Sequence, residues 1–388
     1  MKIGLVLPNV PAYSETFFNN KIKGLQNHGY TILLFVNSNS DNTNIKNIKV
    51  APNLSRNKIF TILVSFKSFL QCVFFHFLPT KKLFLLNKKD NFSFIANIKN
   101  IISNSHILSQ KVDWLHFGFG TMALQRENVA QAIGAKMAVS FRGFDIAIYP
   151  IKNVNCYNTV WKKVNKIHVI SDDIKDLVIK NGYIENNKIV KITPAIDIKL
   201  FKSENKFERQ IFQIITISRL HWKKGLEYTL QALSILKQKN INFHYTIIGD
   251  GAEKERLQFA VYQLGLIDNV TFAGRLSSEE IKTELEKANL YIQYSIQEGF
   301  CNAVLEAQAM GKICIVSDAE GLTENVINNQ TGFVVEKRKP LHLANKIMEV
   351  LNMPEFDKNK ISSQAISRVK NQFNIENQIE QFITFYTK

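Results

Sequence analysis

Cysteine is scarce in this chain, and its few copies are scattered. Four cysteines in 388 residues show no metal-ligand spacing, so we expect a reducing compartment and no disulfide framework. The histidines form no ligand cluster either, and we expect no metal. The apolar residues after Met1-Lys2 stop at Pro8, which is too short for a signal-peptide core. These absences exclude a disulfide-rich secreted domain and a zinc-stabilised domain, and they favour a cytoplasmic protein.

Acidic residues are too few to balance the basic ones. The chain has 33 Asp and Glu against 49 Lys and Arg, a net charge of +16 and a pI near 9.5. Such an excess favours an anionic partner, which could be nucleic acid, a membrane surface or a phosphorylated ligand. The basic residues are spread along the chain and no nucleic-acid-binding signature is visible, so we expect no nucleic acid partner.

The chain is long enough for two domains, and short apolar runs alternate with helical patterns. This order predicts an α/β fold with parallel sheets. A polar stretch at 202–210 is the expected linker. Strands are predicted at 2–7, 31–36, 113–118, 137–141, 167–171, 212–217, 244–248, 269–274, 290–295, 313–316 and 332–335, and helices at 172–181, 225–238 and 376–387.

The segment from Gln297 to Gly311 begins as a polar turn and becomes a helix. We predict Asn302 as the helix N-cap and Gly311 just past the helix end, so that Glu298 lies on the loop and Glu306 about one turn inside. Free amides at such a helix start suit a phosphate, and carboxylates suit sugar hydroxyls. A nucleotide sugar has a ribose, a diphosphate and a hexose in a row, which matches this layout. The alternative is an amphipathic helix with solvated acids.

A second cluster follows the predicted strand 212–217. Arg219 and Lys224 lie on the loop before the helix 225–238, where two fixed cations can neutralise a diphosphate and stabilise it as it leaves. The alternative is a basic surface loop.

These strings resemble the family-four retaining glycosyltransferases, which include enzymes of bacterial exopolysaccharide and lipopolysaccharide synthesis. Glu298 and Glu306 match the E-x7-E motif, within Glu-Gly-Phe, Glu-Ala-x-Ala-x-Gly and Gly-x-x-Glu, and residues 219–225 match Arg-Leu-x3-Lys-Gly. The resemblance implies the GT-B fold, two doubly wound Rossmann-like domains with parallel sheets facing across a cleft. We expect an acceptor-binding domain at 1–203, a nucleotide-sugar-binding domain at 204–372 and a returning helix at 373–388.

The resemblance also implies roles for these residues. Arg219 and Lys224 would bind the leaving diphosphate, Glu298 the hexose hydroxyls and Glu306 the ribose. No metal or other cofactor would be required, because the cations are side chains. The expected donor-binding residues are Gly274, Gly299, Phe300, Cys301, Asn302, Ala303, Val304 and Glu306.

The first half carries weaker motifs of the same family. His116 belongs to a His-Phe-Gly string, and Arg142 stands where a donor-contacting histidine is usual in His-Gly-x-Asp, so Arg142 could bind a phosphate instead. A core histidine and a simple helix cap are the alternatives for His116 and for Ser14. The expected residues of the acceptor-side cleft are Ser14, Glu15, Thr16, His116, Arg142 and Asp145.

Residues 59–85 are unusually rich in phenylalanine, with Lys67 and His76 interrupting the run and Pro79 ending it. This makes a poor transmembrane span. Because Lys81, Lys82, Lys88 and Lys89 lie just beyond Pro79, one interpretation is a membrane-surface element. The other is a buried helix followed by a solvated basic loop.

We therefore predict a hexosyltransferase that moves a sugar from a nucleotide diphosphate sugar to a hydroxyl of a glycan or lipid-linked acceptor. It would be cytoplasmic and could bind peripherally to the inner face of an anionic membrane. Two alternatives stay open, another GT-B enzyme such as a sugar epimerase or a phosphorylase, and a basic non-catalytic protein that binds membrane or nucleic acid. The sugar, the base, the acceptor and the linkage are not determined by the sequence.

Overall fold

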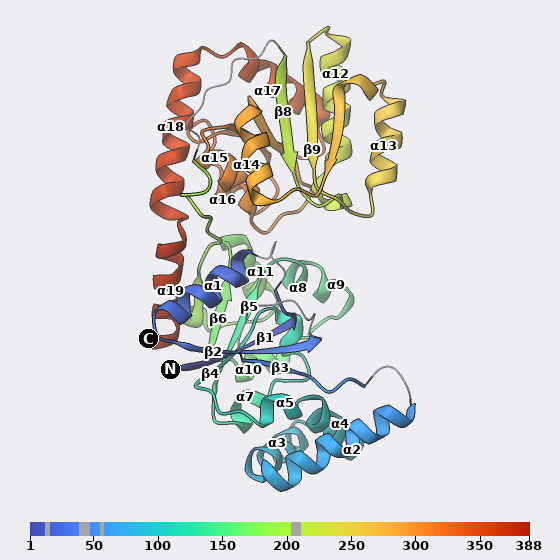
Figure 1. The fold of residues 1–388 in the computed structure, drawn as a ribbon, viewed down its shortest axis with the longest axis vertical. Helices are drawn as coiled ribbons and strands as arrows, with labels where there is room; N and C mark the ends of the chain where they lie inside the picture. Colours follow the sequence, from blue (N-terminus) through green and yellow to red (C-terminus); the bar gives the residue numbers. More distant parts are fainter. Residues whose placement is uncertain (12–15, 39–46, 55–57, 203–210) are drawn as a thin grey trace. The chain divides into compact units, whose positions relative to one another are not determined.

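A computed structural model of the chain describes residues 1–11, 16–38, 47–54, 58–202 and 211–388. The chain divides into two compact units, residues 1–192 with 379–388 and residues 193–378. In its described part each unit is built on one parallel sheet (Figure 1). The predicted fold class, two Rossmann-like α/β domains of the GT-B type, is confirmed. The boundaries predicted from the sequence are 203/204 and 372/373, and the binding roles attached to these ranges stay predictions.

The first unit has a sheet of seven described strands in the order β3-β2-β1-β4-β5-β6-β7. Its neighbouring strands pair in parallel, and β1 lies between β2 and β4. The buried runs of β1 and β2 are continuously apolar, as expected for strands covered on both faces. The strands are β1 (Lys2–Asn9), β2 (Thr31–Ser38), β3 (Ile48–Val50), β4 (Trp114–Phe117), β5 (Lys136–Phe141), β6 (Lys166–Val169) and β7 (Ile189–Lys191).

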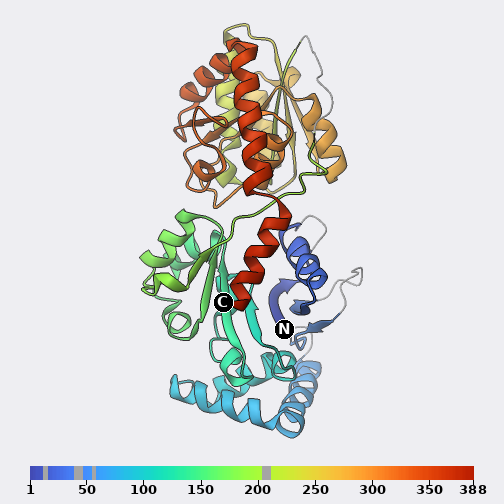
Figure 2. The same ribbon diagram turned by 90° about the vertical axis from the view of Figure 1, so that its left-hand side faces the viewer.

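The last helix of the chain, α19 (Ile375–Thr387), contributes its final turns to this first unit. Phe382, Phe385 and Tyr386 are buried, and Trp114 Nε1 donates to the backbone oxygen of Tyr386 at 3.0 Å. Figure 2 shows these turns lying against the first sheet. The other helices of the unit are α1 (Thr16–Asn27), α2 (Lys58–Phe75), α3 (Phe77–Lys89), α4 (Phe94–Ser103), α5 (Ser105–Leu108), α6 (Gly120–Ala123), α7 (Val129–Ala132), α8 (Phe144–Ala147), α9 (Tyr149–Lys152), α10 (Asn158–Lys163) and α11 (Asp172–Lys180).

Helices α2 to α5 form an insertion between β3 and β4. Pro79 ends the apolar run but does not end a helix, because it lies in the first turn of α3, where a missing amide costs little. The interruption between helices α2 and α3 lies at His76 instead. The interpretation of residues 59–85 as a buried helix followed by a solvated basic loop is wrong, since only Ser68 and Cys72 of α2 are buried and the following lysines lie in helix α3.

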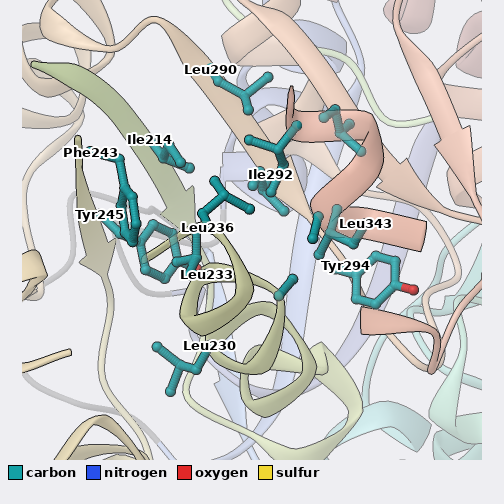
Figure 3. Close-up of a cluster of buried hydrophobic side chains, with 14 of the residues drawn as sticks. Ile214, Leu230, Leu233, Leu236, Phe243, Tyr245, Leu290, Ile292, Tyr294 and Leu343 are labelled. Carbon is teal, nitrogen blue, oxygen red and sulfur yellow. The ribbon is translucent and has the colours of Figure 1, made fainter. Parts of the chain in front are cut away.

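The second unit has a sheet of six described strands in the order β10-β9-β8-β11-β12-β13, again paired in parallel. Leucines of α12 cover one face of this sheet, where Leu230, Leu233 and Leu236 join Ile214 and Tyr245 in the core (Figure 3). The strands are β8 (Phe212–Ile217), β9 (Phe243–Ile248), β10 (Val270–Gly274), β11 (Leu290–Gln293), β12 (Ile313–Ser317) and β13 (Phe333–Val335). The helices are α12 (Leu226–Gln238), α13 (Lys254–Gln263), α14 (Ser278–Lys287), α15 (Asn302–Ala309), α16 (Leu322–Asn325), α17 (Pro340–Asn352) and α18 (Glu355–Gln372).

Candidate active site

The strand order of the second unit reverses at one place. β8 and β11 are neighbours, but the chain leaves β8 toward β9 on one side and β11 toward β12 on the other. In open α/β sheets the loops at the carboxyl ends of two such strands line the ligand crevice. Here these are the loops 218–225 and 294–301, which carry Arg219, Lys224 and Glu298.

The two loops touch through their backbones. Ile296 N donates to Lys223 O at 2.7 Å. Gly225 has φ +63°, and a Cβ there would lie 2.1 Å from Tyr294 O. A side chain at this position would therefore push the loops apart, so glycine is what allows Lys224 to reach Glu298.

Lys224 and Glu298 form an ion pair between Nζ and Oε2, with 9% and 11% of their side chains exposed. Ser295 Oγ lies 3.3 Å from the same carboxylate oxygen. Burial acts to lower the pKa of Lys224, but the charge of Glu298, the nearby Cys301 and the hydrogen bond to Glu298 together outweigh burial, and the pKa is raised. Lys224 is therefore charged, and the pair places a fixed cation beside the Glu298 carboxyl group at the crevice.

Arg219 lies exposed on the same loop, and its charge acts to lower the pKa of Lys224. The loop after β9 supports this segment. Leu220 N donates to Asp250 O at 3.0 Å, and a Cβ at Gly249 would lie 1.9 Å from Ser218 O. Gly274, at the end of β10, accepts a hydrogen bond from Gly249 N at 2.7 Å. The carbonyl of Gly274 thus stabilises the turn after β9.

Helix α15 begins one residue earlier than predicted, and the assignment of Asn302 as N-cap is wrong. Cys301 is the N-cap and Asn302 is the first helical residue. The reason is Asn325, which accepts from Cys301 N at 2.9 Å and donates to Cys301 O at 3.0 Å. Helix geometry still leaves the amides of Asn302 and Ala303 without an acceptor inside the helix, so they can face an anion. Gly311 has φ +72°, as expected just past the helix end.

Glu306 lies in α15 and is half-buried. Desolvation raises the pKa of its carboxyl to about 7. The group therefore changes its charge near neutral pH when the site holds no ligand. Phe300 is buried at the start of this segment and packs on Phe373, with ring centroids 5.7 Å apart.

Two residues that sequence reasoning missed, Glu320 and Lys337, support the Glu298 loop. Glu298 N lies 3.4 Å from Glu320 Oε2, and Lys337 Nζ donates to Glu320 Oε1 at 3.0 Å. Gly321 N donates to Glu298 O at 2.9 Å, and a Cβ at Gly321 would lie 1.9 Å from Gly299 O. The signal available in the sequence was Gly321, which belongs to the Gly-x-x-Glu string.

The structure corrects the expectation that His116 lines a cleft in the first unit. His116 lies in β4 and is fully buried. Its Nε2 is 2.7 Å from Ser140 Oγ, and its Nδ1 is 2.5 Å from Tyr386 Oη and 3.3 Å from Lys21 Nζ. Burial and the nearby Lys21 hold its pKa well below the usual value. It is a core histidine that binds the last helix to the sheet.

Asp145 is also buried, which corrects its expected place in the cleft. Its carboxylate accepts from the amides of Gly120, Arg142 and Gly143 at 2.9 to 3.0 Å. Burial raises its pKa although these amides oppose the shift. Asp145 therefore fixes the turn after β5.

Arg142 and Thr16 are half-buried in the same unit, while Ser14 and Glu15 lie outside the described residues. The guanidinium carbon of Arg142 lies 3.7 Å from the ring centroid of Phe17 and 4.7 Å from that of Phe18, both in α1. These cation–π contacts hold Arg142 beside the first helix. The structure thus brings Arg219, Lys224, Glu298 and α15 together in the second unit, and Arg142 with α1 in the first.

The second unit is similar to a known family of proteins. Residues 197–368 match the family model described as glycosyl transferases group 1. The second unit carries a glycosyltransferase domain. This match confirms the predicted enzyme class, a glycosyltransferase of the transferase class, for that domain.

Two relatives are named for polysaccharide synthesis. WcaL of Escherichia coli, named for colanic acid biosynthesis, is 26% identical over 67% of this chain and 66% of its own length. The amylovoran biosynthesis glycosyltransferase AmsK of Erwinia amylovora is 25% identical over 71% of this chain and 69% of its own. The matched region thus spans about two thirds of the length of each of these two relatives.

A solved structure extends the likeness to both units. HepE of Anabaena, in complex with UDP, superimposes with a TM-score of 0.74 at 16% identity over 99% of this chain and 98% of its own. Similarity at this identity concerns the fold, and it supports the GT-B architecture.

Proposed function

We propose that this protein moves a hexose from a nucleotide diphosphate sugar to a hydroxyl of a glycan or lipid-linked acceptor in cell-surface polysaccharide synthesis. The observation that carries the proposal is the buried Lys224–Glu298 pair at the strand-order reversal, beside Arg219 and the start of α15. The glycosyltransferase match over 197–368 and the roles named for WcaL and AmsK support it. The UDP bound to HepE supports a nucleotide sugar as donor.

In this proposal the cations serve the leaving group. Lys224 and Arg219 stabilise the negative charge that develops on the diphosphate when its bond to the sugar breaks, and the first amides of α15 add backbone donors. Lys224 sits in place before the donor binds, because Glu298 and the surrounding loops hold it, so little reorganisation is needed. With the cations supplied by side chains, we propose that the reaction needs no metal.

The carboxylates serve the sugars. Glu298, oriented by Lys224 and Ser295, would accept from the hexose hydroxyls, and Glu306 would accept from the ribose hydroxyls. The acceptor oxygen forms the new bond to the sugar carbon, the diphosphate leaves, and the acceptor proton goes to the leaving phosphate. By family resemblance the new bond keeps the configuration of the old one.

A panel of nucleotide diphosphate sugars tests the donor. We expect one of them to bind with release of measurable heat, and the protein to hydrolyse it slowly to nucleoside diphosphate and sugar. Proton NMR at early times should show the freed sugar in the anomeric form of the donor, and EDTA should leave the rate unchanged. An inverted anomer contradicts the retaining mechanism, loss of rate in EDTA contradicts the metal-free one, and no binding by any member contradicts the proposal.

A further inference from the structure

The helices inserted between β3 and β4 expose their large apolar side chains. On α2 the buried residues are Ser68 and Cys72, and Thr61 and Ser65 are half-buried on the same side. The outward side carries seven large apolar residues that are 50% to 79% exposed. A helix on a soluble domain has the opposite pattern. The outer apolar set consists of Ile59, Phe60, Ile62, Leu63, Phe66, Phe74 and Phe75 of α2, Phe77, Leu78 and Leu85 of α3, and Phe94 and Ile95 of α4.

The interior between these helices contains a polar network beside the buried Leu83 and Ile101. Asn87 of α3 donates to Asn97 and Asn100 of α4 at 3.0 and 3.1 Å, and Asn97 donates to Phe84 O at 2.8 Å. Asn128 donates to Asn87 at 3.1 Å and joins the network to the start of α7. These buried hydrogen bonds hold the helices together without using the outer apolar set. Helices that pack in an apolar solvent are joined in this way.

The same segment is strongly basic. Residues 58–103 contain seven lysines and one acid, Asp90. Asp90 is engaged internally, because it accepts from Asn128 at 2.7 Å and pairs with Lys163 at 3.3 Å. The outer surface of the segment therefore combines apolar side chains with cations. The exposed lysines are Lys58, Lys67, Lys81, Lys82, Lys88, Lys89 and Lys99.

We propose that α2, α3 and α4 dock this protein on an anionic lipid bilayer. The outer apolar set enters the boundary between headgroups and acyl chains, and the lysines contact lipid phosphates. Figure 1 shows the three helices together beside α5 and α7, so the docking element belongs to the first unit alone. The inference does not depend on the proposed function, although it would bring a lipid-linked acceptor to the same surface.

Helix α2 would lie on the membrane and not cross it. Its 18 residues make it long and apolar enough to span, by length and composition. However, its inner side packs on α3, α4 and α5, and Cys72 O accepts from Thr80 Oγ1 at 3.0 Å. Lys67 lies in the middle of the helix and is exposed. A helix held along one side by a polar scaffold can bury only its other side in lipid.

Charge favours lipid over a second copy of this chain as the occupant. Pairing two copies through this surface would bring two sets of seven lysines together, each with one engaged acid. An anionic bilayer instead neutralises them.

Sedimentation with vesicles tests the proposal on the full chain. We expect binding to vesicles of phosphatidylcholine with one quarter phosphatidylglycerol in 50 mM salt, and at least tenfold weaker binding to pure phosphatidylcholine or in 500 mM salt. Two double variants should each weaken binding at least tenfold. They are Phe74→Ser with Phe75→Ser, and Lys81→Gln with Lys82→Gln. The matched control is Phe356→Ser with Lys360→Gln on α18, where Phe356 is 78% exposed, and it should bind like the wild type. Equal binding by wild type and both helix variants, or none by the wild type, overturns the proposal.

Tryptophans introduced singly at Phe60, Phe66 and Phe75 report depth and require no loss of side-chain volume. Brominated lipids should quench all three at similar shallow depths, and should not quench Phe356→Trp. A much deeper tryptophan at position 66 than at 60 and 75 would mean that α2 spans the membrane, and would contradict the interfacial placement.

Light scattering tests the other possible occupant of this surface, a second copy of the chain. A dimer that Phe74→Ser with Phe75→Ser converts to monomer, in protein that binds no vesicles, would overturn the proposal in favour of self-association.

Discussion

The two units carry polar motif residues at equivalent places, near the carboxyl ends of parallel strands, yet their side chains have different neighbours. In the second unit Lys224 and Glu298 meet on two loops, next to an exposed Arg219. In the first unit His116 is fully buried and contacts Ser140 and Tyr386, and the carboxylate of Asp145 accepts from the amide of Gly120. The comparison teaches that a strand-end position brings a residue to the edge of the sheet but does not decide which way its side chain points.

The cause of the difference lies in what covers each site. In the first unit the last turns of α19 lie over the sheet, and Phe385 stacks on His116 with ring centroids 5.5 Å apart. In the first unit the polar side chain of His116 thus bonds to α19 and holds it on the sheet. In the second unit Gly225 and Gly321 let loops approach backbone to backbone, so the charged side chains stay at the crevice.

The largest effect should come from Lys224→Met. It removes a cation from the leaving group, and we expect kcat/KM to fall about 100- to 1,000-fold. Steady-state rates with the identified donor measure it. The control is Lys346→Met, which breaks the surface pair with Glu349 and should leave the rate unchanged.

Because Lys224→Met also leaves Glu298 buried without its partner, the variant will lose stability. The double variant with Glu298→Gln should regain stability and stay inactive. If the folded Lys224→Met enzyme had the wild-type rate, Lys224 would be a structural residue, like His116 and Asp145 in the first unit.

His116→Ala should have a large effect on stability and little on chemistry. It leaves Tyr386 Oη without its His116 partner in the core and removes one of the two histidine partners of Ser140 Oγ, so the free energy of unfolding should fall by about 2–3 kcal/mol. Urea titration measures the loss, and the rate of the folded enzyme should stay within about threefold of the wild type. Unchanged stability with a lost rate would make His116 a site residue after all.

Donor affinity should rise with pH through the titration of Glu306. The pKa of its carboxyl is raised to about 7 without ligand, and the ionised form is the better acceptor for hydroxyls. At pH 6 about one tenth of the group is ionised, so the donor Kd should be up to about tenfold weaker than at pH 8. Calorimetry at both values measures it. Glu306→Gln should give a flat profile, and a wild type that is equally flat would contradict this role.

The raised pKa of Glu306 also makes the stability of the folded protein depend on pH. An acid whose pKa is higher in the folded than in the unfolded chain disfavours folding once it ionises. Its contribution to stability is therefore present below its ordinary value of 4.5 and is lost as pH rises through about 7. Glu306→Gln should remove this part of the decline in urea titrations of the unliganded protein.

The smallest contrast concerns helix caps. Ser171 in the first unit accepts from Ile174 N at 3.2 Å, so Ser171→Ala should cost about 1 kcal/mol. Asn302 makes no capping bond, so Asn302→Ala should change stability by less than about 0.5 kcal/mol. A larger loss for Asn302→Ala would restore it as a cap.

Much of the fold could be predicted, because apolar runs and strand–helix alternation are local signals. The strand predicted at 212–217 is β8, and the positive φ of Gly311 follows from its place after a helix. The parts that failed depend on distant residues. Asn325 sets the start of α15, and α19 buries His116. The sequence left an exposed and a buried interpretation of α2 open, because its pattern is apolar whichever side faces the core.

Calorimetric titration of the identified nucleotide diphosphate sugar into wild type, Lys224→Met and Lys346→Met tests the central claim most directly. If the donor binds at the strand-order reversal of the second unit, the wild type and Lys346→Met will bind it alike and folded Lys224→Met will bind at least tenfold more weakly. Equal affinity in all three proteins would contradict the account, because the fixed cation beside Glu298 would then lie away from the donor.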